Sequence, residues 1–147
     1  MLNMTYWEEL SEEIFSKVCR EIIEMDESVR FAGIANKMGS LITTIYQKGI
    51  IPLMTKEETS QYALRAVVRA TTREDFEIKL GKLHYSLGKY EKLVRVTIPI
   101  PPITTTSDDH SKSKFYLLVT LEIDSDATSI IERKILPHIV RNKETFK

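Results

Sequence analysis

The sequence predicts an α+β domain in which a five-stranded antiparallel sheet is flanked by helices, in the order α-β-β-α-β-β-β-α. Two segments, residues 5–25 and 126–142, repeat apolar side chains every three or four positions, as amphipathic helices do. Five shorter segments are rich in β-branched and aromatic residues, as strands are. The strands fall into two groups, within residues 29–46 and 83–123, and a third helical pattern separates the groups.

Residues 5–25 are expected to form a surface helix, because acidic side chains lie largely opposite its apolar stripe. The two strands that follow, residues 29–35 and 41–46, enclose the sequence Asn-Lys-Met-Gly, which is typical of a tight turn. One face of the first strand is expected to carry Val29, Phe31, Gly33 and Ala35. The pair therefore reads as a hairpin that begins the sheet.

The middle helix is expected to begin at residue 56, because Thr55 and Glu58 have the spacing of a capping box. Its end is open to two interpretations. A second capping sequence at Thr72 would divide the region into two helices, whereas a single helix would continue to Leu80. Gly81 suits the end of a helix in either case.

Three further strands are predicted at residues 83–87, 93–100 and 115–123, with Gly88-Lys89 as the turn between the first two. Residues 101–113 are proline-rich and then polar, and are expected to form a flexible loop. Pro137 should kink the closing helix or end its regular part. No linker is evident, so residues 1–147 are predicted to form one domain.

The charge balance argues against some classes of function. The chain has 21 basic and 21 acidic residues, which is not typical of proteins that bind nucleic acid by bulk charge. Its single cysteine excludes an internal disulfide and fits a reducing compartment. No apolar run approaches the roughly 20 residues that span a bilayer. The chain is therefore expected to be cytoplasmic and to have no membrane partner.

No residues form a recognisable catalytic, nucleotide-binding or metal-binding motif, so neither an enzyme nor a cofactor is predicted. The three histidines, His84, His110 and His138, lie far apart and lack zinc-ligand spacing. Cys19 falls on an apolar helix face and is expected to be a buried, inert thiol.

Four arginines are the candidate site for an anionic ligand or an acidic partner. Arg65, Arg69 and Arg73 recur every four residues, so a continuous helix would place them along one face. Guanidinium groups in such a row can hold phosphate or carboxylate. The alternative is a solvated helix face with nearby glutamates as local partners. Arg30, in the first strand, would either recognise a ligand or pair with a carboxylate across the sheet.

The first helix is the expected homodimer contact. Its apolar side is wider than a narrow core stripe needs, and the residues expected at the interface are Trp7, Leu10, Ile14 and Phe15. A short sheet also leaves open edges, which association commonly covers.

The predicted order of elements resembles the roadblock and profilin-like fold over nearly the whole chain. The segments VRFAGIANKMG, GIIPL and EDFEIKLGKLHYSLGKYEK also resemble a family of small archaeal proteins. The first resemblance implies a dimeric platform for small GTPases or other signalling partners, which often pairs through a helix and a sheet edge. The second implies an archaeal, cytoplasmic setting. PAS and GAF sensor domains are architectural neighbours that bind small molecules.

The leading hypothesis is a non-enzymatic signalling or scaffold domain that acts as a homodimeric protein-interaction platform, with another signalling protein as a further partner. The alternative is a PAS-like or GAF-like sensor that binds a small anionic ligand. Nucleic-acid binding is a minor alternative, based on the arginine row together with Lys79, Lys82, Lys89 and Lys92.

Overall fold

The structure is a computed structural model that describes residues 4–100, 113 and 115–146. Helix α1 (Met4–Met25) leads into the hairpin of β1 (Val29–Asn36) and β2 (Leu41–Tyr46). Helices α2 (Lys56–Glu74) and α3 (Glu77–Leu80) follow. The remaining elements are β3 (Ser86–Lys89), β4 (Leu93–Ile100), β5 (Phe115–Glu122), α4 (Ala127–Ile130), a π turn (Ile131–Ile135), α5 (Leu136–Arg141) and a 3₁₀ turn (Lys143–Phe146).

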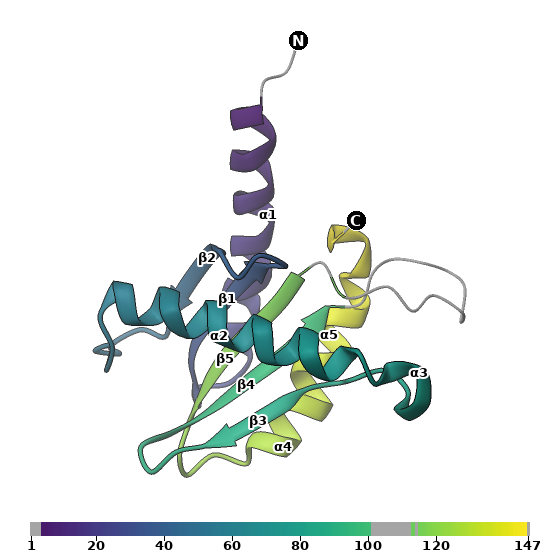
Figure 1. Ribbon diagram of the computed structural model, residues 1–147. Helices are drawn as coiled ribbons and strands as arrows, with labels where there is room; N and C mark the ends of the chain where they lie inside the picture. Colours follow the sequence, from purple (N-terminus) through teal and green to yellow (C-terminus); the bar gives the residue numbers. More distant parts are fainter. Residues whose placement is uncertain (1–3, 101–112, 114, 147) are drawn as a thin grey trace.

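The five strands form one antiparallel sheet in the order β2-β1-β5-β4-β3 (Figure 1). Strand β1 pairs with β5 from the second half of the chain, with Ala32 opposite Val119. The hairpin is therefore the first part of a sheet that both halves complete. The predicted fold class and the antiparallel arrangement are confirmed.

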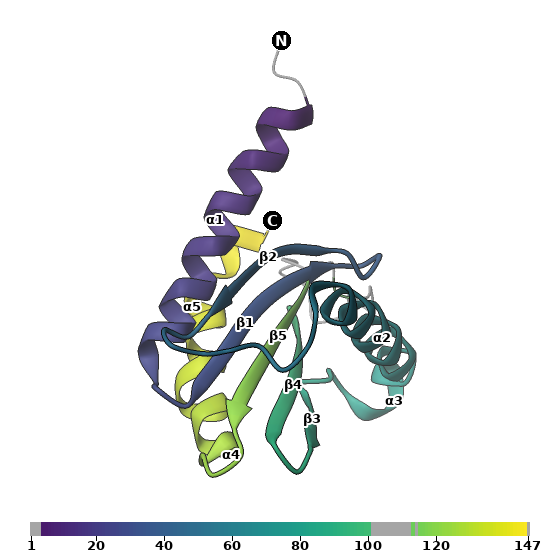
Figure 2. The same cartoon turned by 90° about the vertical axis from the view of Figure 1, so that its left-hand side faces the viewer.

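Helices cover both faces of the sheet (Figure 2). Helix α1 and the C-terminal helices lie on one face, where apolar residues such as Ile22, Val96, Leu117 and Ile131 form the larger core. Helix α2 lies on the other face, where small side chains such as Ala63, Ala66 and Ala70 let the helix approach the sheet closely. Each strand in the middle of the sheet thus buries side chains in two directions.

The hairpin turn is built by its own side chains and packs against α2. The Asn36 side-chain oxygen accepts from the amides of Met38 (2.9 Å) and Ser40 (3.1 Å). Gly39 has φ +82°, and a Cβ atom there would lie 2.6 Å from Leu64 Cδ1. Glycine is therefore needed both for the backbone conformation and for the close approach of α2.

The first strand departs from simple alternation. The register between β1 and β5 shifts between Val29 and Phe31. This bulge places Val29 in the larger core with Ala32, while Phe31 and Ala35 pack under α2. The prediction that Val29 and Phe31 share a face is wrong, because an inserted residue reverses the side on which the next side chain lies.

Helix α2 begins at the predicted residue, and it ends later than the break at Thr72 that one of the two sequence interpretations placed there. Thr55 and Glu58 form the capping box in both directions. The helix continues through Thr72 to Glu74, and a separate short helix follows. Neither sequence interpretation is fully correct, since the break falls after Glu74. Arg73 therefore stays on the same helix as Arg65 and Arg69.

Strand β3 lies later than predicted. Gly88 and Lys89, expected in the turn, belong to the strand, where Gly88 is opposite Arg95. The turn is closed instead by the Tyr90 amide, which donates to the Leu93 carbonyl over 2.9 Å. A Cβ atom at Gly88 would lie 3.7 Å from the Tyr90 ring, which is an ordinary contact.

The closing helix follows the sequence prediction at Pro137. The turn before the proline is a π turn, in which the Leu136 amide donates to the Ile131 carbonyl. A wider turn accommodates the missing amide and the bulk of a proline ring inside a helix. The apolar side of this region is buried, with Ile130, Ile131, Ile135 and Ile139 all in the core.

A buried polar cluster connects the end of α2 to the start of β5. Glu74 is 5% exposed, and its Oε2 accepts from the Ser113 amide over 2.8 Å. The Tyr116 hydroxyl donates to the Ser113 carbonyl over 3.3 Å. Burial and the neighbouring Glu74 raise the pKa of Tyr116, so that it remains a neutral donor. Apart from Ser113, the predicted loop 101–113 lies outside the described residues.

Candidate functional site

The candidate site lies on the α2 side of the sheet, where α2 leaves part of the face uncovered. Residues 47–55, here called the strap, connect β2 to α2. The strap is anchored at Gln47, whose side-chain nitrogen donates to the Ile23 and Val29 carbonyls. Farther along, its apolar side chains Ile51 and Leu53 are largely exposed. The strap and the sheet enclose a small cavity.

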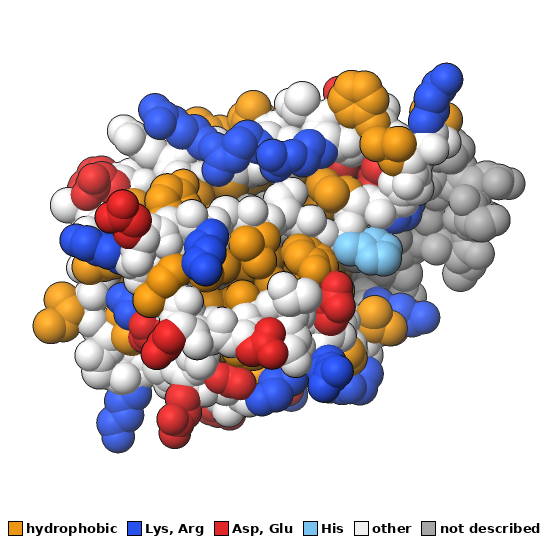
Figure 3. Space-filling view, turned by 90° about the horizontal axis from the view of Figure 1, so that it is seen from below, with side chains coloured by type: hydrophobic (Ala, Val, Ile, Leu, Met, Phe, Trp, Pro, Cys, Tyr) orange, Lys and Arg blue, Asp and Glu red, His pale blue; other side chains and the backbone are white. Residues whose placement is uncertain are grey.

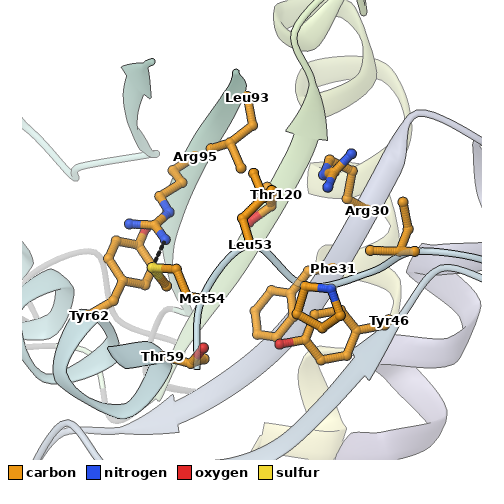
Figure 4. Close-up of a pocket in the computed structure, with 12 residues that line it drawn as sticks. Arg30, Phe31, Tyr46, Leu53, Met54, Thr59, Tyr62, Leu93, Arg95 and Thr120 are labelled. Carbon is orange, nitrogen blue, oxygen red and sulfur yellow. Dashed lines mark hydrogen bonds between the residues drawn. The ribbon is translucent and has the colours of Figure 1, made fainter. Parts of the chain in front are cut away.

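This cavity, here called the strap pocket, has a volume of about 60 Å³. Arg30 and Arg95 lie on opposite sides of it, and Thr120 and Leu53 lie between them (Figure 4). The other lining residues are mostly apolar or aromatic: Phe31, Tyr46, Ile50, Pro52, Met54, Thr59, Tyr62 and Leu93.

Arg95 is the least conventional residue of the site. Its guanidinium carbon lies 3.7 Å from the centre of the Tyr62 ring and 5.5 Å from that of Tyr90. Its Nη2 donates to the Met54 sulfur over 2.8 Å, and its buried Nε has no hydrogen-bond partner. No carboxylate of the described residues forms an ion pair with it. Its charge is therefore supported by aromatic faces and a thioether.

Arg30 differs from Arg95 because its charge is paired. Its Nη1 lies 2.9 Å from Glu122 Oε1, across the sheet from β1 to β5. The Arg30 side chain is only 16% exposed, so solvent screens the pair less than it screens a surface ion pair. Of the two predicted roles for Arg30, the structure contains the ion pair, and it also places this residue in the wall of the strap pocket.

The predicted arginine row is present on α2, and all three side chains are exposed. Figure 3 shows basic side chains aligned along one border of a partly apolar surface. Arg69 and Arg73, with Arg95, line a second hollow of about 140 Å³ between α2 and β3, here called the α2–β3 groove. Arg65 lines neither hollow, because successive steps of four residues rotate about 40° around a helix.

The α2–β3 groove carries positive charge without acidic lining. Its three arginines are accompanied by uncharged residues: Tyr62, Ala66, Ser86, Leu87, Gly88, Tyr90 and Thr97. Arg73 Nη1 donates to the Ser86 hydroxyl over 3.2 Å, which joins α2 to β3. Burial raises the pKa of Tyr62 although Arg95 opposes this effect, so the ring that faces Arg95 is neutral. The groove is thus suited to an acidic partner.

The residues predicted for a dimer contact on α1 are in different environments. Phe15 is 4% exposed and packs against Phe115 and Phe146, with ring centres 4.9 Å and 5.4 Å away. It is a core residue, so its assignment to a surface contact is wrong. Ile14 is 39% exposed and Leu10 is half-buried, while the side chain of Trp7 lies outside the described residues. The N-terminal turns of α1 extend beyond the sheet (Figures 1 and 2).

Within the described residues, no three His, Cys, Asp or Glu side chains are grouped as a metal site requires. The sequence Asp108-Asp109-His110 lies outside the described part of the chain. None of the described helices is both long enough and apolar enough to cross a membrane.

Sequence reasoning missed Arg95, Tyr62 and Met54. One signal for Arg95 was present: it is the only charged residue in the apolar run LVRVTIPI of β4. A charge inside a central strand indicates a specific environment, here two tyrosine rings near the guanidinium group. The positions of Tyr62 and Met54 depend on how α2 and the strap pack over the sheet, which no local pattern contains.

By sequence, the chain matches no family model and no curated protein. By structure, it is similar to the gliding protein MglB of Thermus thermophilus, with a TM-score of 0.64 and 12% identity over 92% of this chain and 87% of that chain. It is also similar to a Roadblock/LC7 domain from Streptomyces avermitilis, with a TM-score of 0.60 and 9% identity over 86% of this chain and 92% of that chain.

A third similar structure is that of an MglB protein in a tetrameric arrangement, with a TM-score of 0.63 and 10% identity over 99% of this chain and 93% of that chain. These similarities extend over nearly the full length of both partners and agree with the element order predicted from the sequence. The chain therefore has the Roadblock/LC7 fold.

Proposed function

We propose that the protein is a non-enzymatic signalling or scaffold domain that acts as a homodimeric protein-interaction platform, and that two copies meet through α2 and β3. The observation that carries this proposal is the charge pattern along α2. Glu58 lies near its start, and Arg69 and Arg73 lie near its end, on the flank that faces β3. The midpoint of the helix falls at Arg65.

This pattern is complementary to itself in an antiparallel pair. A two-fold axis at the middle of α2 would place Glu58 of one copy opposite Arg73 of the other, and the reverse contact would repeat it. The same axis would bring Arg69 toward the Tyr62 ring of the second copy, a favourable cation–π arrangement. A parallel pair would instead place like charges together. The charge order thus favours one orientation of a second copy.

The neighbouring sheet edge supports the same contact. Strand β3 is the outermost of the described strands on this side, so no described strand pairs with the hydrogen-bonding groups on its outer edge. Leu87 and Tyr90, at 41% and 54% exposed, place apolar surface beside that edge. Pairing through α2 and β3 would cover the edge, the apolar surface and the cationic groove together.

Two comparisons support self-association. The similar MglB structure with a tetrameric arrangement is an assembly of copies, and this chain shares its fold. The roadblock resemblance implies platforms that pair through a helix and a sheet edge, with small GTPases or other signalling proteins as partners. Such a protein needs no catalytic residues of its own.

The test is the molar mass in solution, measured by light scattering during size-exclusion chromatography. The wild type is expected at twice the 17.0 kDa of one chain. The double variant Arg69→Glu, Arg73→Glu should be monomeric, because positions 58, 69 and 73 of both copies would then all be negative and repel one another. A wild type that remains at 17.0 kDa at micromolar concentration would contradict the proposal.

The matched control is a charge placed on α1, where the sequence predicted the contact. Ile14 is 39% exposed, so Ile14→Glu changes the surface without opening the core. It should leave the dimer intact. If Ile14→Glu dissociates the dimer and the double arginine variant does not, α1 is the contact and the α2 interface is wrong.

A further inference from the structure

The strap pocket has the features of a ligand site, and two of its lining residues, Tyr62 and Arg95, also line the α2–β3 groove of the proposed interface. It lies between β1, β4 and β5 on one side and the strap and α2 on the other. Arg30 and Arg95 lie on opposite sides of a largely apolar interior, with the Arg95 guanidinium turned toward Tyr62 and Met54 (Figure 4). Ligand sites commonly combine an apolar wall with a few fixed polar groups in this way.

The charges around the pocket favour an anion with one negative charge. Among the described residues, Arg30 and Arg95 are the charged residues that line the pocket. Glu122 pairs with Arg30 at 2.9 Å and offsets one of the two charges. Arg95 lacks a carboxylate partner among the described residues, although its side chain is largely enclosed by Tyr62, Met54 and the sheet. One positive charge is therefore left to attract a ligand.

The volume and the lining residues of the strap pocket limit the size and the charge of a ligand that fits it. A volume of about 60 Å³ has room for roughly four to six water-sized groups. Of the lining side chains, Phe31, Tyr46 and Leu53 present apolar surface, and Thr120 adds a hydroxyl beside the arginines. An ion with a single charge and a short hydrocarbon part fits this lining better than a phosphate, which carries more than one negative charge at neutral pH and has no hydrocarbon part.

We infer that the strap pocket binds a small organic monocarboxylate. The carboxylate accepts hydrogen bonds from the Arg95 guanidinium, which is held against the Tyr62 ring. The hydrocarbon part packs against Phe31, Tyr46 and Leu53. The strap covers the ligand through its lining residues Ile50, Pro52, Leu53 and Met54. Every lining residue of the pocket belongs to one copy of the chain.

The experiment is calorimetric titration of the full chain with propionate, the neutral isostere propionamide and inorganic phosphate. Propionate is expected to bind, and propionamide and phosphate to bind at least about tenfold more weakly. Equal binding of propionate and propionamide would overturn the role of the charge. Stronger binding of phosphate would overturn the monocarboxylate class, as would no detectable heat with propionate.

Variants of single arginines test whether propionate binds in the strap pocket. Arg95→Gln should abolish propionate binding, and Arg95→Lys, which keeps the charge but loses the planar fork, should weaken it by about tenfold. Arg65→Gln is the matched control, because Arg65 is exposed on the adjacent helix and lines neither hollow. Unchanged affinity in Arg95→Lys or a loss of affinity in Arg65→Gln would overturn the site.

Methyl resonances of methionine provide a readout that does not require a variant to fold. Met54 contacts Arg95 directly, whereas Met38 lies at the hairpin turn and outside the pocket lining. Propionate should shift the Met54 methyl signal and leave that of Met38 in place. A shift of Met38 alone, or of neither signal at saturating propionate, would overturn the proposal.

Discussion

At the scale of single residues, burial changes the pKa of titratable side chains and so determines whether their reactive form is present. Cys19 has no exposed surface, and burial raises the pKa of its thiol to about 12, against a smaller opposing effect from Arg20. The thiolate is the reactive form. This cysteine therefore contributes packing to the core.

Cys19 should accordingly resist a thiol reagent in the native protein at mildly alkaline pH. The same reagent should react promptly in denaturing urea, where the thiol has its ordinary pKa. Spectroscopic release of the reagent's leaving group measures both rates. Fast labelling of the native protein would show that the first helix opens readily or that the thiol is not buried.

His138 gives the stability a dependence on pH. Burial lowers its pKa, against an opposing effect from Glu21, whose Oε2 lies 3.9 Å from His138 Nε2. Because the folded-state pKa is below the unfolded value of 6.5, the unfolded chain binds the proton more readily. The neutral, buried His138 therefore contributes fully to the free energy of unfolding above pH 6.5, and this contribution is lost as the pH falls below 6.5.

The urea midpoint of the wild type should therefore fall more than that of His138→Gln between about pH 7.5 and about pH 5.5. Carboxylates titrate in both proteins and cancel from the comparison. Parallel decreases in the two proteins would mean that His138 titrates equally in the folded and unfolded states.

At the scale of elements, local patterns predicted what local interactions determine. The capping box at Thr55 depends on residues three positions apart, and it formed as predicted. The hairpin turn likewise depends on Asn36 and Gly39. The bulge beside Arg30 and the later position of β3 could not be predicted in this way, because both depend on the strand opposite.

The hairpin turn offers a paired test of local conformation and packing. Gly39 and Gly49 both have φ +82°, but only at Gly39 would a Cβ meet another residue, Leu64. Gly49→Ala should lower the free energy of unfolding by about 1 kcal/mol from backbone strain alone. Gly39→Ala should cost about 2–3 kcal/mol, since the clash adds to the strain. Urea unfolding measures both values.

Equal losses in the two glycine variants would mean that the turn moves away from α2 without cost. The contact between the hairpin and α2 would then contribute little to the stability of this side of the sheet.

At the scale of the whole molecule, the sequence predicted a single antiparallel sheet built from both halves of the chain, because five segments carry the residue types typical of strands. The sequence also predicted the arginine row, because residues four positions apart lie along the same side of a helix. The environment of Arg95 required the strap, α2 and β4 to be placed together. The same limitation explains Phe15, whose packing against Phe115 and Phe146 joins segments far apart in the sequence.

We propose that the charge order along α2 brings two copies together in an antiparallel pair. Two complementary variants test this order. Glu58→Lys gives one chain positive charges at positions 58, 69 and 73, and Arg69→Glu, Arg73→Glu gives the other chain negative charges there. Each variant alone would place like charges together across the two-fold axis. A mixture would restore opposite charges at both ends of the helix pair.

Glu58→Lys also removes half of the capping box, so circular dichroism must first show that this chain is folded. Light scattering of each variant alone and of an equal mixture is then the most direct measurement. Each variant alone is expected to be a monomer, and the mixture is expected to form a heterodimer. A mixture that remains monomeric, or a variant that dimerises alone, would contradict it.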